Sequence, residues 1–277
     1  MYDTLISVEH LLENLGNTDW VVIDCRYDLG DAVAGHQSYL EGHISGAIYA
    51  DLHKHLAGEV SADSGRHPLP DEASLTEVFS SFGIDADKQV VAYDGASGAF
   101  AARLWWLLRY MGHSRVAVLD GGWQAWMTKT RPCEAGVSRP SPAEFKGRAQ
   151  PDKLVMLDQV LQSELLVDSR ESARYRGEFE PIDPVAGHIP GARNHFFQNN
   201  LTVDSRFLPA KVLKAQFREV FSGTEPENVV FYCGSGVTAC HNLLAMAHAG
   251  LPDAKLYAGS WSEWCRSGER PVARGSD

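Results

Sequence analysis

The sequence has no long apolar run, and its charge has the wrong sign for a protein that binds nucleic acid. None of its hydrophobic stretches approaches the roughly 20 residues that a membrane helix needs. The net charge is −11, with 25 Lys and Arg against 36 Asp and Glu in 277 residues, whereas nucleic-acid binding requires a basic face. We therefore expect neither a membrane nor a nucleic-acid partner.

Cysteine is also scarce. The five cysteines are an odd number, widely scattered, without a CxxC pair or a Cys/His cluster, which argues against a disulfide framework and against a zinc site. The segment Met1–Ile6 lacks the charged-then-apolar layout of a signal peptide. We predict a cytoplasmic protein with reduced thiols and without a metal or organic cofactor.

One of these cysteines, Cys233, lies in an informative setting. The apolar run Val229–Tyr232 predicts a strand, and the glycines and small residues after Cys233 predict a tight turn that leads into a helix. Backbone N–H groups at a helix N-terminus favour the thiolate, which is the nucleophilic form of cysteine. The alternative is a buried structural cysteine, the usual state of a free thiol.

The chain also repeats itself. Four segments of the first half recur in the same order roughly 140 residues later, a spacing far longer than the period of solenoid repeats. The matches pair Val22–Arg26 with Leu166–Arg170, Gly42–Ala47 with Gly187–Ala192, Val90–Gly95 with Val229–Gly234, and Gly121–Trp126 with Gly259–Trp264. We infer a duplicated domain, with halves at 1–135 and 150–277 and a Pro-, Gly- and Ser-containing linker at 136–149.

Within each half, short apolar runs alternate with helical patterns. The runs predict strands at Val21–Ile23, Val90–Tyr93, Val116–Leu119, Leu165–Val167 and Val229–Tyr232, and the longer patterns predict helices at Ser97–Met111 and Val237–Ala249. Apolar strands separated by helices indicate an α/β fold with a mostly parallel sheet covered by helices on both faces. In such sheets the ligand sites lie at the carboxyl ends of strands.

The loop Cys233-Gly234-Ser235-Gly236-Val237-Thr238 resembles the active-site loop of the rhodanese superfamily of sulfurtransferases. The resemblance covers nearly the whole chain and implies two tandem rhodanese-like domains. It also implies that the loop cysteine accepts a sulfur atom as a persulfide and passes it to a small thiol, a thioredoxin-like protein or cyanide. The residue sequence of the loop is similar to that of the 3-mercaptopyruvate branch. The thiosulfate branch typically carries a basic residue at the position of Gly234.

Only the second half has the loop cysteine, because Asp94 stands at the matching position of the first half. A carboxylate cannot carry a persulfide. We therefore predict that the first half is non-catalytic and forms one wall of a cleft between the domains, where ligand sites are common.

The resemblance assigns roles to further residues. Cys233 would be the nucleophile, and Ser235, His67 and Asp51 would form a proton relay for the leaving enolate. Arg174 would bind the anionic end of the donor. The loop residues Gly234, Gly236, Val237 and Thr238 would line the donor site. For Ser235 and Thr238 the alternative is turn formation and helix capping, for His67 a loop histidine without a ligand, and for Arg174 a surface salt bridge.

One segment departs from the 3-mercaptopyruvate branch. That branch usually has a second arginine near a Glu-Pro pair, whereas residues 178–183 contain no arginine. Arg66 or Arg193 would then have to replace it. The donor is therefore 3-mercaptopyruvate in our first hypothesis and thiosulfate in the alternative.

Two further classes share this fold. Rhodanese-fold phosphatases use Cys-x5-Arg, and Ala239 occupies the place of that arginine, which argues against phosphoryl chemistry. A non-catalytic binding module is the remaining alternative, and the intact Cys233 loop argues against it for the second half.

Overall fold

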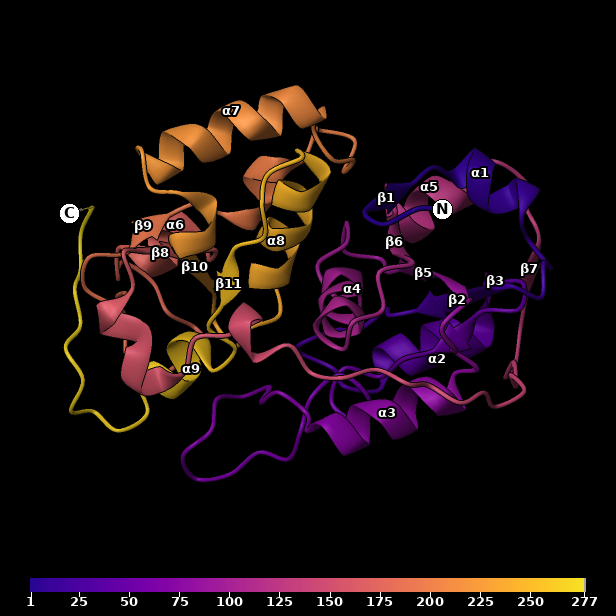
Figure 1. The fold of residues 1–277 in the computed structure, drawn as a ribbon, viewed down its shortest axis with the longest axis horizontal. Helices are drawn as coiled ribbons and strands as arrows, with labels where there is room; N and C mark the ends of the chain where they lie inside the picture. Colours follow the sequence, from indigo (N-terminus) through magenta and orange to yellow (C-terminus); the bar gives the residue numbers. More distant parts are fainter. Residues whose placement is uncertain (277) are drawn as a thin grey trace. The chain divides into compact units, whose positions relative to one another are not determined.

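The computed structural model describes residues 1–276 and divides into two compact units (Figure 1). Unit 1 consists of Met1–Gly58, Pro70–Gln150 and Val203–Arg206. Unit 2 consists of Glu59–Leu69, Pro151–Thr202 and Phe207–Asp277. Segment 59–69, which belongs to the first half of the sequence repeat, therefore clusters with unit 2, and the halves 1–135 and 150–277 remain our proposal for the duplicated units.

Unit 1 is built on a five-stranded parallel sheet with the order β1-β6-β5-β2-β4. Its strands are β1 (Leu5–Ile6), β2 (Trp20–Asp24), β4 (Ile48–Tyr49), β5 (Gln89–Tyr93) and β6 (Val116–Leu119), and a separate antiparallel pair joins β3 (His43–Ile44) to β7 (Cys133–Glu134). Its helices are α1 (Val8–Glu13), α2 (Ala34–Glu41), α3 (Glu72–Ser81), α4 (Ala101–Tyr110) and α5 (Gly122–Met127).

Alternate residues of these strands pack on opposite faces of the sheet, as the strand period requires. On one face, Val22 and Val91 form a buried cluster with Leu11 of α1 and Trp126 of α5. Helix α4 packs against β5 and β6. Burial of apolar side chains between these layers is the main stabilising contribution to such a unit.

Unit 2 has a four-stranded parallel sheet with the order β11-β10-β8-β9. Its strands are β8 (Leu165–Asp168), β9 (Arg193–Asn194), β10 (Val229–Tyr232) and β11 (Lys255–Leu256). Its α-helices are α6 (Ser172–Tyr175), α7 (Ala210–Phe221), α8 (Ala239–His248) and α9 (Ser260–Trp264), and its 3-10 helices are η1 (Pro151–Lys153), η2 (Leu157–Gln162), η3 (Phe197–Asn200) and η4 (Pro226–Asn228).

The sheet of unit 2 is also covered by helices. Leu166 and Val230 share a buried cluster with Tyr175 of α6 and Trp261 of α9. Helix α8 packs against β10, and α7 packs against α8 (Figure 1). The predicted α/β fold with two mostly parallel, helix-covered sheets is therefore confirmed.

The five predicted strands are all present, but the two predicted helices begin too early. Helix α4 begins at Ala101 rather than Ser97, because Ser97 and Gly98 adopt positive φ angles of 59° and 91°. Helix α8 begins at Ala239 rather than Val237, since Thr238 occupies the N-cap position. In both units, the residues that precede the helix belong to the loop that follows a central strand.

Both units carry a buried ion pair just after the first long strand of the sheet. Arg26 Nη2 lies 2.6 Å from Asp24 Oδ2 in unit 1, and Arg170 Nη2 lies 2.6 Å from Asp168 Oδ2 in unit 2. Each arginine also lies over a tryptophan ring, Trp123 and Trp261 respectively. The repeated Asp and Arg residues of the two halves thus form equivalent structural ion pairs.

Candidate functional site

Cys233 immediately follows β10, which pairs with β8 on one side and β11 on the other. The thiol therefore lies at the carboxyl end of an inner strand, where parallel sheets place ligand sites. Its side chain is buried, with a relative exposure of 2%.

The loop after Cys233 curls around the sulfur. Gly236 has a φ angle of +75°, and a Cβ atom there would lie 2.3 Å from the carbonyl oxygen of Ala258, so that only glycine fits. Thr238 makes no side-chain cap hydrogen bond to helix α8; its hydroxyl group instead helps to lower the pKa of the Cys233 thiol. Capping, the alternative interpretation of Thr238, is thereby excluded.

The electrostatic balance at Cys233 favours the thiolate. Burial raises the pKa of the Cys233 thiol, but hydrogen bonds from the Thr238 hydroxyl group and from the backbone N–H groups of Ser235 and Ala239 lower it by more. The net pKa lies below the ordinary value of cysteine. A thiolate at neutral pH is the form required for nucleophilic attack on sulfur.

Helix α9 holds the loop from the other side. The backbone N–H group of Cys233 donates to Ser260 Oγ at 3.1 Å. The carbonyl oxygens of Cys233 and Gly234 accept from the backbone N–H groups of Trp261 and Ser262, at 3.0 and 2.9 Å. The loop backbone is therefore fixed independently of any substrate.

His67 and Ser235 lie together in unit 2. His67 Nδ1 and Ser235 Oγ share a hydrogen bond of 2.7 Å, and both residues are buried. Two of the three predicted relay residues are thus in direct contact. Asp51 belongs to unit 1, where its carboxylate accepts from the backbone N–H groups of His53 and Lys54.

Segment 59–69 carries His67 and is attached to unit 2 by several hydrogen bonds. Arg266 Nη1 donates to the carbonyl oxygens of Ser61 and Ala62, and the backbone N–H group of Arg66 donates to Ser262 Oγ at 3.0 Å. A Cβ atom on Gly65 would lie 2.5 Å from the carbonyl oxygen of Gly259. This close approach fixes the segment next to the loop that follows Cys233.

Two arginines lie at this loop. A Cβ atom on Gly234 would lie 2.9 Å from Arg66 Nη2 and 3.7 Å from Arg174 Nη2. Burial lowers the pKa of Arg66, and the negative charge of a Cys233 thiolate acts in the opposite direction. The predicted residue Arg174 therefore lies next to the Cys233 loop, and Arg66 lies beside it.

Both arginines are paired with buried carboxylates. Arg174 donates to Glu180 through Nε and Nη2, at 3.1 and 2.7 Å, and Arg174 Nη2 lies 3.3 Å from Asp183 Oδ2. Arg66 Nη1 donates to Asp183 Oδ1. The contacts of Glu180 and Asp183 with these arginines were not predicted, although both residues stand in the segment that departs from the 3-mercaptopyruvate branch.

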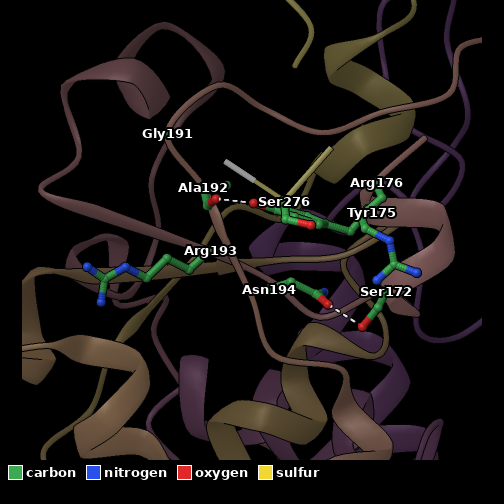
Figure 2. A pocket seen from close by; sticks show the side chains of 8 residues that line it. All are labelled: Ser172, Tyr175, Arg176, Gly191, Ala192, Arg193, Asn194 and Ser276. Carbon is green, nitrogen blue, oxygen red and sulfur yellow. Dashed lines mark hydrogen bonds between the residues drawn. The ribbon is translucent and has the colours of Figure 1, made fainter. Parts of the chain in front are cut away.

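Arg193, the other arginine considered as a replacement, lines a different part of unit 2 (Figure 2). Its Nη1 atom donates to the carbonyl oxygen of Val220. The cavity there, of about 490 Å³, is lined by Ser172, Tyr175, Arg176, Gly191, Ala192, Arg193, Asn194 and Ser276. Cys233 is not among these lining residues. Arg66 is therefore a better candidate than Arg193 for the place of the missing second arginine.

The matching loop of unit 1 encloses a carboxylate instead of a thiol. Asp94 is fully buried, and its two oxygens accept four backbone N–H groups, those of Ala96, Gly98, Phe100 and Ala101, at 2.8–2.9 Å. Burial raises the pKa of Asp94, and these N–H groups oppose the shift. The anion-binding shape of the loop is thus retained, but its centre is filled by the chain itself.

Comparison with known families gives two matches along the chain. Residues 7–129 and 145–267 each match the model of the rhodanese-like domain. A probable 3-mercaptopyruvate sulfurtransferase from Pseudomonas aeruginosa is 46% identical over 280 residues, which cover 98% of this chain and 98% of that protein. Thiosulfate sulfurtransferase from Bos taurus is 35% identical over 279 residues, which cover 95% of this chain and 92% of that protein.

Solved structures show the same likeness. A 3-mercaptopyruvate sulfurtransferase from Leishmania major matches with a TM-score of 0.87 and 28% identity, covering 98% of this chain and 76% of that one. SseA from Escherichia coli, described with the rhodanese fold of 3-mercaptopyruvate sulfotransferases, matches with a TM-score of 0.81 and 30% identity, covering 94% of this chain and 100% of that one.

Among residues 1–276, the structure has no helix long and apolar enough to cross a membrane.

Proposed function

The chain belongs to the rhodanese-like family of sulfurtransferases, and from this membership we propose that it moves a sulfane sulfur from 3-mercaptopyruvate to a thiophilic acceptor through a persulfide on Cys233. The observation that carries the choice of donor is the 2.7 Å hydrogen bond between Ser235 and His67. This pair supplies proton handling beside the nucleophile, and 3-mercaptopyruvate requires it.

In the first step, the Cys233 thiolate attacks the sulfur atom of 3-mercaptopyruvate. The new S–S bond forms while the C–S bond breaks, and the electron pair of that bond leaves with carbon as the enolate of pyruvate. The enolate takes up a proton to give pyruvate, and Cys233 is left as a persulfide. The lowered pKa of Cys233 supports this assignment because it raises the fraction of thiolate at neutral pH.

Ser235 and His67 would move the proton to the leaving enolate. An imidazole titrates in the neutral range and suits this task, and its contact with the Ser235 hydroxyl group gives it a path to the donor. Asp51 enters the relay from the family resemblance alone. Replacement of Asp51 by Asn should slow turnover of 3-mercaptopyruvate if it orients His67.

Arg174 and Arg66 would bind the carboxylate of the donor. A guanidinium group pairs with a carboxylate through two N–H groups, and both arginines lie beside Gly234. Gly234, Gly236, Val237 and Thr238 would form the wall of the donor site nearest the sulfur. Arg66 is our proposal for the residue that replaces the missing second arginine.

In the second step, a thiolate of a small thiol or of a thioredoxin-like protein, or cyanide, attacks the outer sulfur of the persulfide. The S–S bond breaks and Cys233 leaves as a thiolate, ready for a second cycle. The two steps predict ping-pong kinetics. We propose that they take place in the cytoplasm, with the five cysteines as free thiols.

Thiosulfate is the alternative donor. Its attack by Cys233 releases sulfite, a good leaving group that needs no proton. The absence of an arginine from residues 178–183 favours this alternative, and thiosulfate sulfurtransferases occur among the relatives of the chain. Turnover of 3-mercaptopyruvate therefore requires proton transfer by Ser235 and His67, whereas turnover of thiosulfate does not.

The deciding experiment measures kcat/KM for 3-mercaptopyruvate and for thiosulfate with the same acceptor. A preference for 3-mercaptopyruvate supports the proposal, and a preference for thiosulfate replaces it by the alternative. Cys233→Ser should form no persulfide from either donor. If this variant still transfers sulfur, the assignment of the persulfide to Cys233 is wrong. If the wild type retains no labelled sulfur after gel filtration, the persulfide mechanism is wrong and a non-catalytic binding role gains support.

A further inference from the structure

The carboxylate of Asp183 joins the two arginines beside the nucleophile. Its Oδ1 atom accepts from Arg66 Nη1, and its Oδ2 atom lies 3.3 Å from Arg174 Nη2. The side chain of Asp183 is 3% exposed. Its carboxylate thus bridges the two guanidinium groups, as a bound anion would.

The arginines still present N–H groups toward the loop. In the described part of the chain, Arg66 Nη2 and Arg174 Nη1 donate no hydrogen bond, and they lie 2.9 and 3.8 Å from the position of a Cβ atom on Gly234. These are the N–H groups that an incoming anionic donor would meet. Asp183 therefore leaves the donor-facing side of the pair open while it neutralises the other side.

Glu180 has a different part in the cluster. It accepts from Arg170 Nη1 and Arg174, and also from the backbone N–H groups of Ile182 and Asp183, at 3.0 and 3.1 Å. Its carboxylate holds the loop together and orients Arg174. Asp183, by contrast, makes no other hydrogen bond through its carboxylate in residues 1–276 than those to the two arginines.

The charges of this cluster cancel. Arg66, Arg170 and Arg174 face three carboxylates, which are those of Asp168, Glu180 and Asp183. A donor approaching Cys233 therefore meets no surplus positive charge, and the thiolate adds a negative one. In a partly buried site each uncompensated unit of charge raises the electrostatic free energy of binding. A donor with two negative charges is therefore disfavoured relative to a donor with one.

We propose that Asp183 selects the donor by charge: by neutralising the Arg66–Arg174 pair, it favours monoanionic 3-mercaptopyruvate over dianionic thiosulfate. The inference rests on the proposed function, because it assumes that these donors bind at this arginine pair. It deepens that function by naming the residue that sets the donor preference. It also gives a physical meaning to the segment in which the chain departs from the 3-mercaptopyruvate branch.

The test compares Asp183→Asn with the wild type by the ratio of kcat/KM for thiosulfate to kcat/KM for 3-mercaptopyruvate. We expect this ratio to rise about tenfold, as one unit of charge in a partly exposed site predicts. The rise should shrink at high salt, since screening weakens the attraction of a dianion more than that of a monoanion. Asp183→Ser serves as a second variant that also removes the charge.

The matched control is Glu178→Gln, which removes an exposed carboxylate of the same segment that pairs with Arg176. It should leave the ratio unchanged. If Asp183 only positions the arginines, its variants will lose activity with both donors by the same factor, and the unchanged ratio overturns the inference.

A second readout does not depend on sulfur transfer. Sulfate and pyruvate, as a dianion and a monoanion, should each slow the alkylation of Cys233 by iodoacetamide, and Asp183→Asn should strengthen protection by sulfate about tenfold relative to pyruvate. If the wild type transfers no sulfur from either donor, the proposed function fails, yet this protection ratio still decides the role of Asp183. An unchanged protection ratio overturns the inference even if sulfur transfer is observed.

Discussion

Ser235 Oγ and His67 Nδ1 lie 2.7 Å apart although the two residues are separated by 168 positions in the sequence. Ser235 belongs to the loop after β10, whereas His67 arrives on segment 59–69, which clusters with unit 2. The contact depends on the attachment of that segment to helix α9 through Arg66 and Ser262. A reaction that needs a proton beside Cys233 therefore depends on residues from both halves of the sequence.

Replacement of either partner should separate the two donors. We expect His67→Gln and Ser235→Ala to lower kcat/KM for 3-mercaptopyruvate by about 100-fold, the usual contribution of a positioned acid or base. Turnover of thiosulfate should change by less than about threefold, because sulfite leaves without a proton. Steady-state assays with both donors check this, and an equal loss with both would assign the pair a structural role.

The Thr238 hydroxyl group should control the ionisation of the nucleophile. Thr238→Val keeps the shape of the side chain but removes a hydrogen bond that lowers the pKa of Cys233. Because only the thiolate reacts, the rise of activity with pH should move to higher pH, and the rate at neutral pH should fall roughly threefold to tenfold. The rate of alkylation of Cys233 by iodoacetamide as a function of pH measures this shift directly. A profile that coincides with the wild type would contradict the assignment.

Asp94 should contribute to the stability of unit 1 without contributing to catalysis. Asp94→Asn places an NH₂ group against two of the four backbone N–H donors that the carboxylate now satisfies. Leaving buried donors unpaired should cost about 2 kcal/mol or more of unfolding free energy. Thermal and urea unfolding measure this cost, and kcat at a temperature well below unfolding should stay unchanged. A variant as stable as the wild type would show that the loop does not need an anion.

Local pattern was sufficient to predict much of this architecture. The five strands follow from short apolar runs, and the duplicated halves follow from repeated segments such as Gly42–Ala47. The position of Cys233 at the carboxyl end of a strand follows from the strand-turn-helix order, whereas the inner place of that strand in the sheet does not. These features depend on residues close together in the chain, for which periodicity and turn chemistry carry the information.

What the sequence did not reveal depends on contacts between distant segments. The bridge from Arg66 to Asp183 spans 117 positions, and no pattern near either residue indicates it. The early start predicted for α4 fails for a local reason instead, because the N–H groups of Gly98, Phe100 and Ala101 bind the carboxylate of Asp94, a few residues earlier in the chain. Side-chain pairing of this kind overrides the local preference for helix.

The attachment of segment 59–69 should respond to a single methyl group. Gly65→Ala places a Cβ atom 2.5 Å from the carbonyl oxygen of Gly259, so the segment must move away from helix α9. We expect a loss of activity with both donors of at least about tenfold, since misplacing binding groups by about 1 Å is costly. Gly42→Ala is the control, because a Cβ atom there meets nothing within 4 Å. Equal activity of the two variants would show that the segment tolerates displacement.

The two units differ in how they satisfy one buried histidine, and this difference predicts a stabilising substitution. His43 Nε2 of unit 1 bonds to Glu134 Oε1, whereas His188 Nε2 of unit 2 has no hydrogen-bond partner among residues 1–276. Both histidines stack on a tyrosine, and His188 pairs with Ala273 across the backbone just as His43 pairs with Glu134.

Ala273→Gln should therefore supply the missing donor. Because Nδ1 of His188 already donates to the carbonyl oxygen of Tyr175 at 2.7 Å, Nε2 of the neutral ring is an acceptor, which the NH₂ group of a glutamine side chain can satisfy. At the matching position of unit 1, Glu134 also accepts from the backbone N–H group of Gly46, whose counterpart in the sequence repeat is Gly191. We expect Ala273→Gln to raise the unfolding free energy by about 1 kcal/mol, the usual net value of such a bond, and Glu134→Ala to lower it by at least as much. Thermal unfolding of both variants provides the measurement. Ala273→Glu, whose carboxylate only accepts, is the control, and an equal gain with Glu would show that a donor to Nε2 is not responsible.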